Sequence, residues 1–202
     1  MHARIVLASA SPRRRDLLRE AGLDFEVRPV EVDEDLGGFA DPRAAALELA
    51  RRKAHAGARR EVAQRPAERA WVLGADTVVA LEAPGGWRLL GKPEDEREAR
   101  GMLASLSGTR HAVVTGVCAV RVPDLEERAG AELTWVSMRP LSAAEVEAYA
   151  ASGEWRGKAG GYAIQEQAER FVTRLEEGGL DNVVGLPVSL ALALLREAGA
   201  PV

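Results

Sequence analysis

The chain has 202 residues, of which 47% are hydrophobic and 29% charged, and its formal net charge at pH 7 is −4. These values are typical of a folded globular protein with a substantial core, and they exclude a disordered chain. The acidic charge argues against nucleic acid or an anionic membrane as a partner, because both usually require a basic surface. It leaves room for a small basic pocket.

Strands and helices alternate along the first third of the chain. Ser11 can cap a helix whose first position is Pro12, and Gly22 suits its end. Asp41 and Pro42 open a longer helix in the same way. The expected elements are a strand over 4–9, a helix over 11–22, a strand over 25–28, an acidic loop over 29–40 and a helix over 41–62.

The rest of the chain also alternates and shows neither repeats nor a linker. The turn residues at 83–86 predict a hairpin, and SAAE at 142–145 is a capping box that opens a helix. We therefore expect one mixed α/β (α+β) domain spanning residues 1–202. The further expected elements are a strand over 71–81 interrupted by small residues, a returning strand over 87–93, a helix over about 94–106, strands over 110–122 and 132–141, a helix from 142, a Gly-rich loop over 153–165 and a final helix from Pro187.

The stretch SASPRR, residues 9–14, is the first candidate for binding chemistry. The free backbone N–H groups of a helix N-terminus and the helix dipole favour an anion. Arginines in that first turn are unfavourable unless an anion sits opposite, and a guanidinium can bind two phosphate oxygens at once. The alternative is a solvated arginine run that follows a capping serine. The candidate anion-binding residues are Ser9, Ser11, Arg13 and Arg14.

Asp76 interrupts an otherwise apolar strand in GADTVV, residues 74–79. An ionised carboxylate at such a place is costly unless it is paired or binds a metal. It could be a ligand of a divalent cation or a base that activates water, and the plainer alternative is a strand-end aspartate that caps a local turn. We favour a functional role, because Thr77 and the small residues at 74–75 leave room for a ligand.

The acidic stretch EVDED, residues 31–35, offers further carboxylates. Carboxylates are the hard oxygen ligands that Mg²⁺ and Mn²⁺ prefer. A run of charges is more often a solvated loop, so this stretch alone is a weaker indication than Asp76.

Only three of the 27 basic residues are lysines, namely Lys53, Lys92 and Lys158. An ammonium group is a compact charge that approaches a phosphate oxygen where a planar guanidinium does not fit. Lys53 borders the predicted buried face of its helix, and Lys92 lies at the hairpin exit before a proline. We expect all three to face an anion, with leftover surface lysines as the alternative.

The Gly-rich stretch KAGGYAIQ begins at Lys158. Its glycines permit a close backbone approach, Tyr162 could stack on a base, and Gln165 could form a hydrogen bond with a base edge. The alternative is an ordinary turn that leads into a strand. Several cations, a helix N-terminus and carboxylates with a divalent ion together describe a polyphosphate site.

Cys118 is the only cysteine and lies in the apolar run VVTGVCAV. We therefore expect a buried structural thiol rather than a nucleophile. A single cysteine excludes an intramolecular disulfide, which fits the reducing cytoplasm, where we expect the protein to reside. No apolar stretch approaches the length of a membrane span.

Seven short stretches occur in a fixed order, namely LASASPRR, VDE, GADTVV, GKP, TG at 115–116, KAGGYAIQ and VVGLP at 183–187. Over residues 4 to about 196 they resemble the Maf family of nucleoside triphosphate pyrophosphatases, the septum formation inhibitor-like proteins. The resemblance implies an elongated, twisted mixed sheet flanked by helices, with two lobes around a central cleft, as in inosine triphosphate pyrophosphatases. It also implies a homodimer that hydrolyses a nucleoside triphosphate to the monophosphate and pyrophosphate, with Mg²⁺ or Mn²⁺ as the divalent metal.

The resemblance also assigns roles to residues. Asp76 would be the catalytic acid–base residue, and Asp33 and Glu34 would join it around a metal ion or water. Lys53 and Lys92 would complete the catalytic group. The substrate phosphates would be held by Ser9, Arg13, Arg14, Lys53 and Lys92, with Ser11 and Lys158 beside them.

The family has one branch that acts on dTTP and UTP and another that acts on 7-methyl-GTP. The stretches SPRR, GADT and YAIQ resemble the dTTP/UTP branch, in which Arg13, Thr77 and Gln165 would tune base recognition. One departure is GGYAIQ, where the common form is GAYGIQ. Three alternatives stay open, namely the same chemistry on 7-methyl-GTP, the same chemistry on a modified pyrimidine triphosphate, and a non-catalytic nucleotide-binding regulator of cell division.

Overall fold

The computed structural model of the chain describes residues 4–35 and 38–202, and these residues form a seven-stranded sheet. The strands are β1 (Arg4–Leu7), β2 (Glu26–Val27), β3 (Ala70–Ala83), β4 (Gly86–Leu90), β5 (Arg110–Val122), β6 (Glu127–Met138) and β7 (Val172–Glu176). Their order is β2-β1-β3-β5-β6-β7, and β4 pairs with β3 as well. β1 runs parallel to β2 and β3, and the other pairs are antiparallel. The predicted mixed sheet is confirmed.

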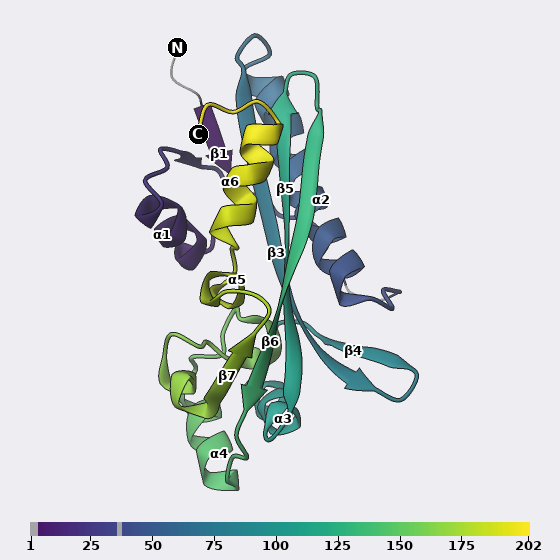
Figure 1. Cartoon of the computed structure of the whole chain (residues 1–202), viewed down its shortest axis with the longest axis vertical. Coiled ribbons are helices and arrows are strands. Elements are labelled where there is room, and N and C mark those ends of the chain that lie inside the picture. Colours follow the sequence, from purple (N-terminus) through teal and green to yellow (C-terminus); the bar gives the residue numbers. More distant parts are fainter. Residues whose placement is uncertain (1–3, 36–37) are drawn as a thin grey trace.

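Helices flank the sheet. They are α1 (Pro12–Glu20), α2 (Pro42–Gln64), α3 (Glu96–Leu106), α4 (Ala143–Ser152), α5 (Leu180–Val184) and α6 (Val188–Glu197), with 3₁₀ turns at Ala159–Gly161 and Gln167–Phe171. Figure 1 shows α2 along one side of the long strands and α1 and α6 along the other, with α3 and α4 at the far end of an elongated molecule. This arrangement is the one predicted. No helix of the described residues is long and apolar enough to cross a membrane.

Polar side chains begin several helices where the sequence predicts. The side chain of Asp41 accepts a hydrogen bond from the backbone N–H of Ala44 (2.8 Å) at the start of α2. Ser142 and Glu145 form the reciprocal capping box of α4. Ser11 stands at the N-cap position of α1, but its side chain makes no capping hydrogen bond.

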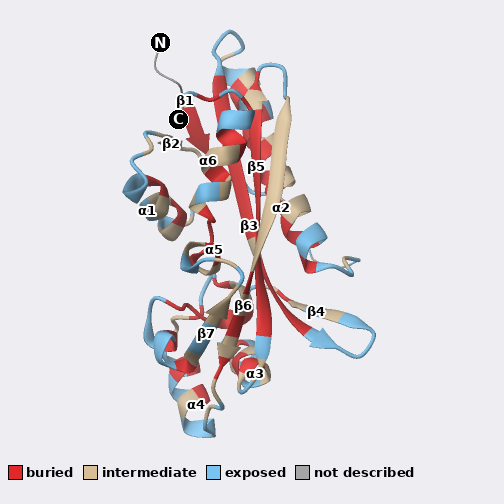
Figure 2. Ribbon diagram, viewed as in Figure 1, coloured by how far each residue is buried: buried red, intermediate tan, exposed pale blue. Residues whose placement is uncertain are grey.

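Successive residues of β3 alternate between two cores. Leu73 and Ala75 pack with Leu194 of α6 on one face, whereas Val72 and Val78 pack against α2 on the other. Figure 2 shows β3 and β5 buried along most of their length. Because side chains alternate along a strand, Asp76 faces α2 and Thr77 faces the opposite side.

One edge of β3 is shared by two partners. β1 pairs with residues 70–73 of β3, and β4 pairs with residues 79–83. Between them, no strand of the described residues pairs with 74–78 on this edge. Asp76 and Thr77 lie at this gap on opposite faces of β3, and both line the same cavity.

Two glycines allow α2 to lie directly on the sheet. A Cβ atom added at Gly116 would lie 2.2 Å from the backbone oxygen of Ala46, and one at Gly74 would lie 2.5 Å from that of Ala50. Neither distance is compatible with a side chain. The prediction that small residues interrupt the strand was therefore wrong. β3 is continuous, and its small residues instead make room for the helix.

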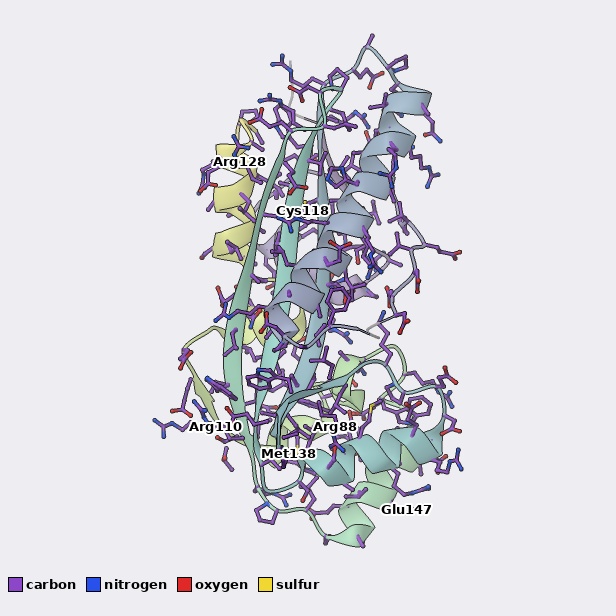
Figure 3. All side chains as sticks on the ribbon, turned by 90° about the vertical axis from the view of Figure 1, so that its right-hand side faces the viewer. Arg88, Arg110, Cys118, Arg128, Met138 and Glu147 are labelled. Carbon is purple, nitrogen blue, oxygen red and sulfur yellow. The ribbon has the colours of Figure 1, made fainter. Side chains whose placement is uncertain are left out.

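The thiol of Cys118 is buried between β5 and α2. In Figure 3 α2 runs diagonally over the sheet, and Cys118 is labelled on β5. Burial raises the pKa of this thiol to about 12, so it is a thiol rather than a thiolate at neutral pH. The prediction of a structural cysteine is confirmed.

Candidate active site

A cavity of about 610 Å³ opens at the gap in the edge of β3. Its wall combines the end of β1, the start of α1, the middle of β3, residues 156–166 and residues 183–185. The volume lies within the ~300–1,000 Å³ that small-molecule sites occupy. The lining residues come from both halves of the elongated molecule, since β1 and α1 lie toward one end and residues 156–166 toward the other (Figure 1).

Positive charge gathers in this cavity although the whole chain is acidic. Among the described residues that line it, six side chains are cationic and three are anionic. Such an excess of positive charge attracts a ligand with several negative charges. The cations are Arg13, Arg14, Lys53, Lys92, Arg156 and Lys158, and the anions are Glu34, Asp76 and Glu166.

Asp76 and Lys53 form a buried ion pair in the wall. Only 5% of Asp76 and 6% of Lys53 are exposed. Lys53 Nζ donates to Asp76 Oδ1 and lies 2.6 Å from Glu34 Oε1. Lys53 reaches this place because α2 crosses β3 in backbone contact at Gly74. The sequence prediction that Asp76 must be paired or bind a metal is met by this pair.

Glu34 extends the ion pair into a chain of alternating charges. Its second oxygen, Oε2, accepts a hydrogen bond from Lys92 Nζ. Partial burial raises the pKa of Glu34, but its hydrogen bonds and charge interactions with Lys53 and Lys92 outweigh burial and lower the pKa to about 2. The carboxylate is therefore ionised at neutral pH and holds two lysines at the cavity.

Arg14 occupies the other face of β3. Its Nη1 donates to Ser9 Oγ (3.1 Å), its Nη2 to Thr77 Oγ1 (3.2 Å) and its Nε to the backbone oxygen of Gly185 (2.7 Å). Arg13 Nε donates to the backbone oxygen of Val184 (3.3 Å). Burial lowers the pKa of both arginines, yet a guanidinium stays protonated. Carbonyl oxygens thus hold two cations at a helix N-terminus, ready for an anionic ligand.

Lys158 is buried and held by its own segment. Its Nζ donates to the backbone oxygen of Glu154 and to Glu166 Oε2 (2.8 Å). These bonds tie Lys158 to both ends of the segment 154–166. Gln165 lies in this segment and is exposed at the cavity. The geometry favours a role for Lys158 in holding this segment, beside its predicted role in substrate binding.

The structure brings eleven of the twelve predicted site residues to this one cavity. Asp33 is the exception, because it is exposed and does not line the cavity. Its carboxylate accepts the backbone N–H of Asp35 (2.9 Å) and so shapes the loop. Its predicted metal role gains no support. The residues brought together are Ser9, Ser11, Arg13, Arg14, Glu34, Lys53, Asp76, Thr77, Lys92, Lys158 and Gln165.

Sequence reasoning missed two charged residues of the cavity. Arg156 and Glu166 flank the predicted KAGGYAIQ segment and line the same wall. Both are exposed surface residues in an Arg-rich, Glu-rich chain, so nothing in the local sequence distinguishes them. Their proximity to Lys158 along the chain is the only signal that could have included them.

The donor set fits a divalent cation that also contacts substrate. Glu34 and Asp76 place two carboxylates around one lysine. Mg²⁺ is usually held by one or two carboxylates together with substrate phosphates. No group of three or more His, Cys, Asp and Glu residues that could hold a metal ion exists among the described residues. A cation bound here would therefore share its ligands with the substrate.

The wall residue Tyr162 is supported by a buried histidine. His111 is 0% exposed, and its Nε2 lies 2.8 Å from the hydroxyl oxygen of Tyr162. Burial lowers the pKa of His111 from 6.5 to about 4. The folded protein therefore favours the neutral ring, and its stability falls as the pH drops from 6.5 to 4.

We expect this single group to make the unfolding free energy fall by about 3 kcal/mol between pH 6.5 and pH 4. Urea unfolding of the wild type and of His111→Gln over this range measures the effect. The variant should show the flatter dependence on pH. Parallel curves for the two proteins would contradict a neutral, buried His111.

The chain is similar to known proteins along nearly its whole length. The family model described as Maf-like protein matches residues 4–198. The dTTP/UTP pyrophosphatase of Anaeromyxobacter sp. (strain Fw109-5) is 45% identical over 204 residues, which cover 100% of this chain and 92% of that protein. The dTTP/UTP pyrophosphatase of Hyphomonas neptunium is 46% identical over 198 residues, which cover 98% and 96%.

Among solved structures, a nucleoside-triphosphatase (dITP/XTP pyrophosphatase) from Mycobacterium abscessus aligns with a TM-score of 0.41 and 20% identity. The alignment covers 67% of this chain and 72% of that protein.

Proposed function

Because this chain belongs to the family of Maf-like proteins, we propose that it hydrolyses dTTP and UTP to the monophosphate and pyrophosphate. The observation that supports this most directly is the cavity itself, which is lined by the Asp76–Lys53 pair and five further cations although the chain as a whole is acidic. Relatives at 45% and 46% identity that are named dTTP/UTP pyrophosphatases support the choice of substrate.

The two faces of β3 would bind different parts of the nucleotide. On the α2 face, Lys53 and Lys92 would take the negative charge of the phosphates. At the gap itself, Ser9 and the free N–H groups at the start of α1 would add hydrogen-bond donors for the same phosphates. On the opposite face, Arg13 and Thr77 would contact the base. The triphosphate would then lie across the gap in the sheet edge.

Asp76 would be the group that activates water. Its carboxylate would accept a hydrogen bond and then a proton from the water that attacks the α-phosphorus. The new bond joins the water oxygen to this phosphorus, and the bond to the bridging oxygen breaks, so that pyrophosphate leaves. Lys53 and Lys92 would stabilise the charge that develops on the leaving group. A divalent cation held by Glu34 and Asp76 would, when bound, neutralise charge on the phosphate oxygens.

A panel of nucleoside triphosphates with added Mg²⁺ or Mn²⁺ tests the proposal. We expect dTTP and UTP to give the monophosphate and pyrophosphate in equal amounts, at a higher kcat/KM than other nucleotides. A preference for 7-methyl-GTP would contradict the proposed substrate. Tight binding of UTP without any product would instead support a non-catalytic, nucleotide-sensing protein.

Replacement of Lys92 by Gln should lower kcat/KM for UTP by about 10²-fold, the usual cost of one lost donor to developing charge. Lys92 is exposed and its partner Glu34 keeps Lys53, so the melting temperature should not change. Arg97→Gln is a matched control, since Arg97 is an exposed cation on α3 outside the cavity. Equal activity of the two variants would contradict the assignment.

We also propose that the protein acts in the cytoplasm as a homodimer. The single buried cysteine suits a reducing compartment, and the family resemblance supports the dimer. Light scattering of the purified protein measures the assembly. A mass close to the 21.6 kDa of one chain at micromolar concentration would contradict the dimer.

A further inference from the structure

Thr77 is the first member of a series of hydrogen bonds that leads from the cavity wall into the protein interior. Thr77 Oγ1 lies 2.9 Å from Thr115 Oγ1 on the neighbouring strand β5. Thr115 Oγ1 in turn lies 2.9 Å from the backbone oxygen of Asn182 in α5. Thr115 and Asn182 are both 0% exposed, so water cannot replace any partner in this series.

Asn182, the last member of this series of hydrogen bonds, is held in place by its neighbours. Asn182, the only asparagine of the protein, donates from its side-chain amide to the backbone oxygen of Val113 (3.1 Å) and to Thr134 Oγ1 (2.8 Å). Its backbone N–H donates to Asp181 Oδ1 (2.9 Å). These bonds join α5 to β5 and β6, and they fix the position of the Asn182 carbonyl.

The chemistry of the partners determines the position of each proton. A carbonyl oxygen can only accept, so the Thr115 hydroxyl must donate to Asn182. Thr115 has then used its only proton, so the hydrogen bond between the two threonines must be donated by Thr77. Arg14 Nη2 is a donor and occupies one lone pair of Thr77 Oγ1 (3.2 Å). The reverse arrangement would leave two buried oxygens facing each other without a proton.

Thr77 therefore has no proton left for a ligand. It lines the cavity with one free lone pair, and a hydroxyl held in this way acts as an acceptor only. We propose that Thr115 is a positioning residue for substrate specificity, which turns the Thr77 proton away from the cavity so that Thr77 selects a ligand N–H group.

On the proposed function, the ligand group is the imide N3–H of uracil or thymine. Cytosine has a lone pair at N3 and would meet the lone pair of Thr77, which is repulsive. The same wall carries Arg13, which is a donor only and suits the carbonyl oxygens beside N3. Thr115 would thus make the protein bind UTP more tightly than CTP, although Thr115 contacts neither nucleotide.

Thr115→Val tests this role, because valine has nearly the shape of threonine and lacks the hydroxyl. The Asn182 oxygen keeps a donor in the variant, since the backbone N–H of Gly185 also donates to it (3.1 Å). The Thr77 hydroxyl can then turn and donate to cytosine. The readout is the ratio of Kd values, by calorimetry, for the non-hydrolysable α,β-imido analogues of CTP and UTP.

We expect wild type to prefer the UTP analogue, and Thr115→Val to lower this preference by about tenfold, chiefly through tighter binding of the CTP analogue. Thr115→Ser keeps the hydroxyl and should retain the wild-type ratio. Thr109→Val is the matched control, because it removes a threonine hydroxyl that bonds the backbone oxygen of Leu106 outside the cavity. In a Thr77→Val background, Thr115→Val should have no further effect.

An unchanged ratio in Thr115→Val, or an equal change in the Thr77→Val background, would overturn the inference. So would a wild type without preference between the analogues, or a Thr115→Ser ratio that matches Thr115→Val. Because the analogues are not hydrolysed, this result is independent of turnover. Failure of UTP hydrolysis in the wild type would count against the proposed function alone.

Discussion

Replacement of Asp76 by Asn is expected to lower kcat for UTP by about 10²–10⁴-fold, the usual contribution of a general base. Asparagine has nearly the same shape and can still accept a hydrogen bond from Lys53, but it cannot take a proton. Lys53 keeps Glu34 as its counter-ion at 2.6 Å, so the buried ammonium is not left unpaired. The loss should therefore appear in turnover, with the fold intact.

Circular dichroism and thermal melting check the fold of this variant, and pyrophosphate release measures its turnover. Glu82→Gln serves as the control, since Glu82 is an exposed carboxylate on the same strand outside the cavity. It should retain wild-type activity. Near-normal turnover in Asp76→Asn would remove Asp76 from the mechanism, and a variant that unfolds would assign it a structural role.

Replacement of Gly116 by Ala should lower the unfolding free energy by about 3 kcal/mol or more, which is the upper range of overpacking. The added Cβ would lie 2.2 Å from the backbone oxygen of Ala46 and 2.4 Å from its carbonyl carbon. Backbone atoms of a helix cannot turn aside as a side chain does, so α2 must move away from the sheet. Lys53 moves with α2, and the remaining folded protein should lose activity as well.

Gly101→Ala is the matched control for this prediction. Gly101 lies in α3, and a Cβ there meets nothing within 4 Å. Alanine should stabilise that helix by roughly 0.5–1 kcal/mol, because glycine is the weaker helix former. Denaturant unfolding measures both variants. A stable Gly116→Ala protein with wild-type activity would contradict the close contact between α2 and β5.

Local sequence signals predicted most of the elements. The Asp41 and Ser142 caps, the hairpin at 83–86 and the long helix from Pro42 are encoded by residues close in sequence. The sequence did not predict β7 or α5. β7 is a short edge strand with charged and exposed residues, so it lacks the apolar pattern of a strand. α5 has five residues, too few for a helical period to show.

The candidate site was predicted through residues whose chemistry is costly or rare in their context. Asp76 in an apolar strand and the scarce lysines are such residues, and they meet at one cavity. Asn182 is the only asparagine and Thr115 lies in the TG stretch at 115–116, but neither fact indicates that the two residues form a hydrogen bond with each other. They are 67 positions apart, and their hydrogen bond depends on how α5 packs on β5. Polar groups that are satisfied only through tertiary contacts cannot be identified from local patterns.

The central claim is that a nucleoside triphosphate lies across the gap in the edge of β3, with its phosphates on the α2 face and its base on the opposite face. A crystal structure of Asp76→Asn with UTP and Mg²⁺ tests this claim most directly. We expect the α-phosphate beside residue 76, the outer phosphates beside Lys53 and Lys92, and the uracil N3 beside Thr77. A nucleotide bound elsewhere, or with its base against the lysines, would contradict the claim.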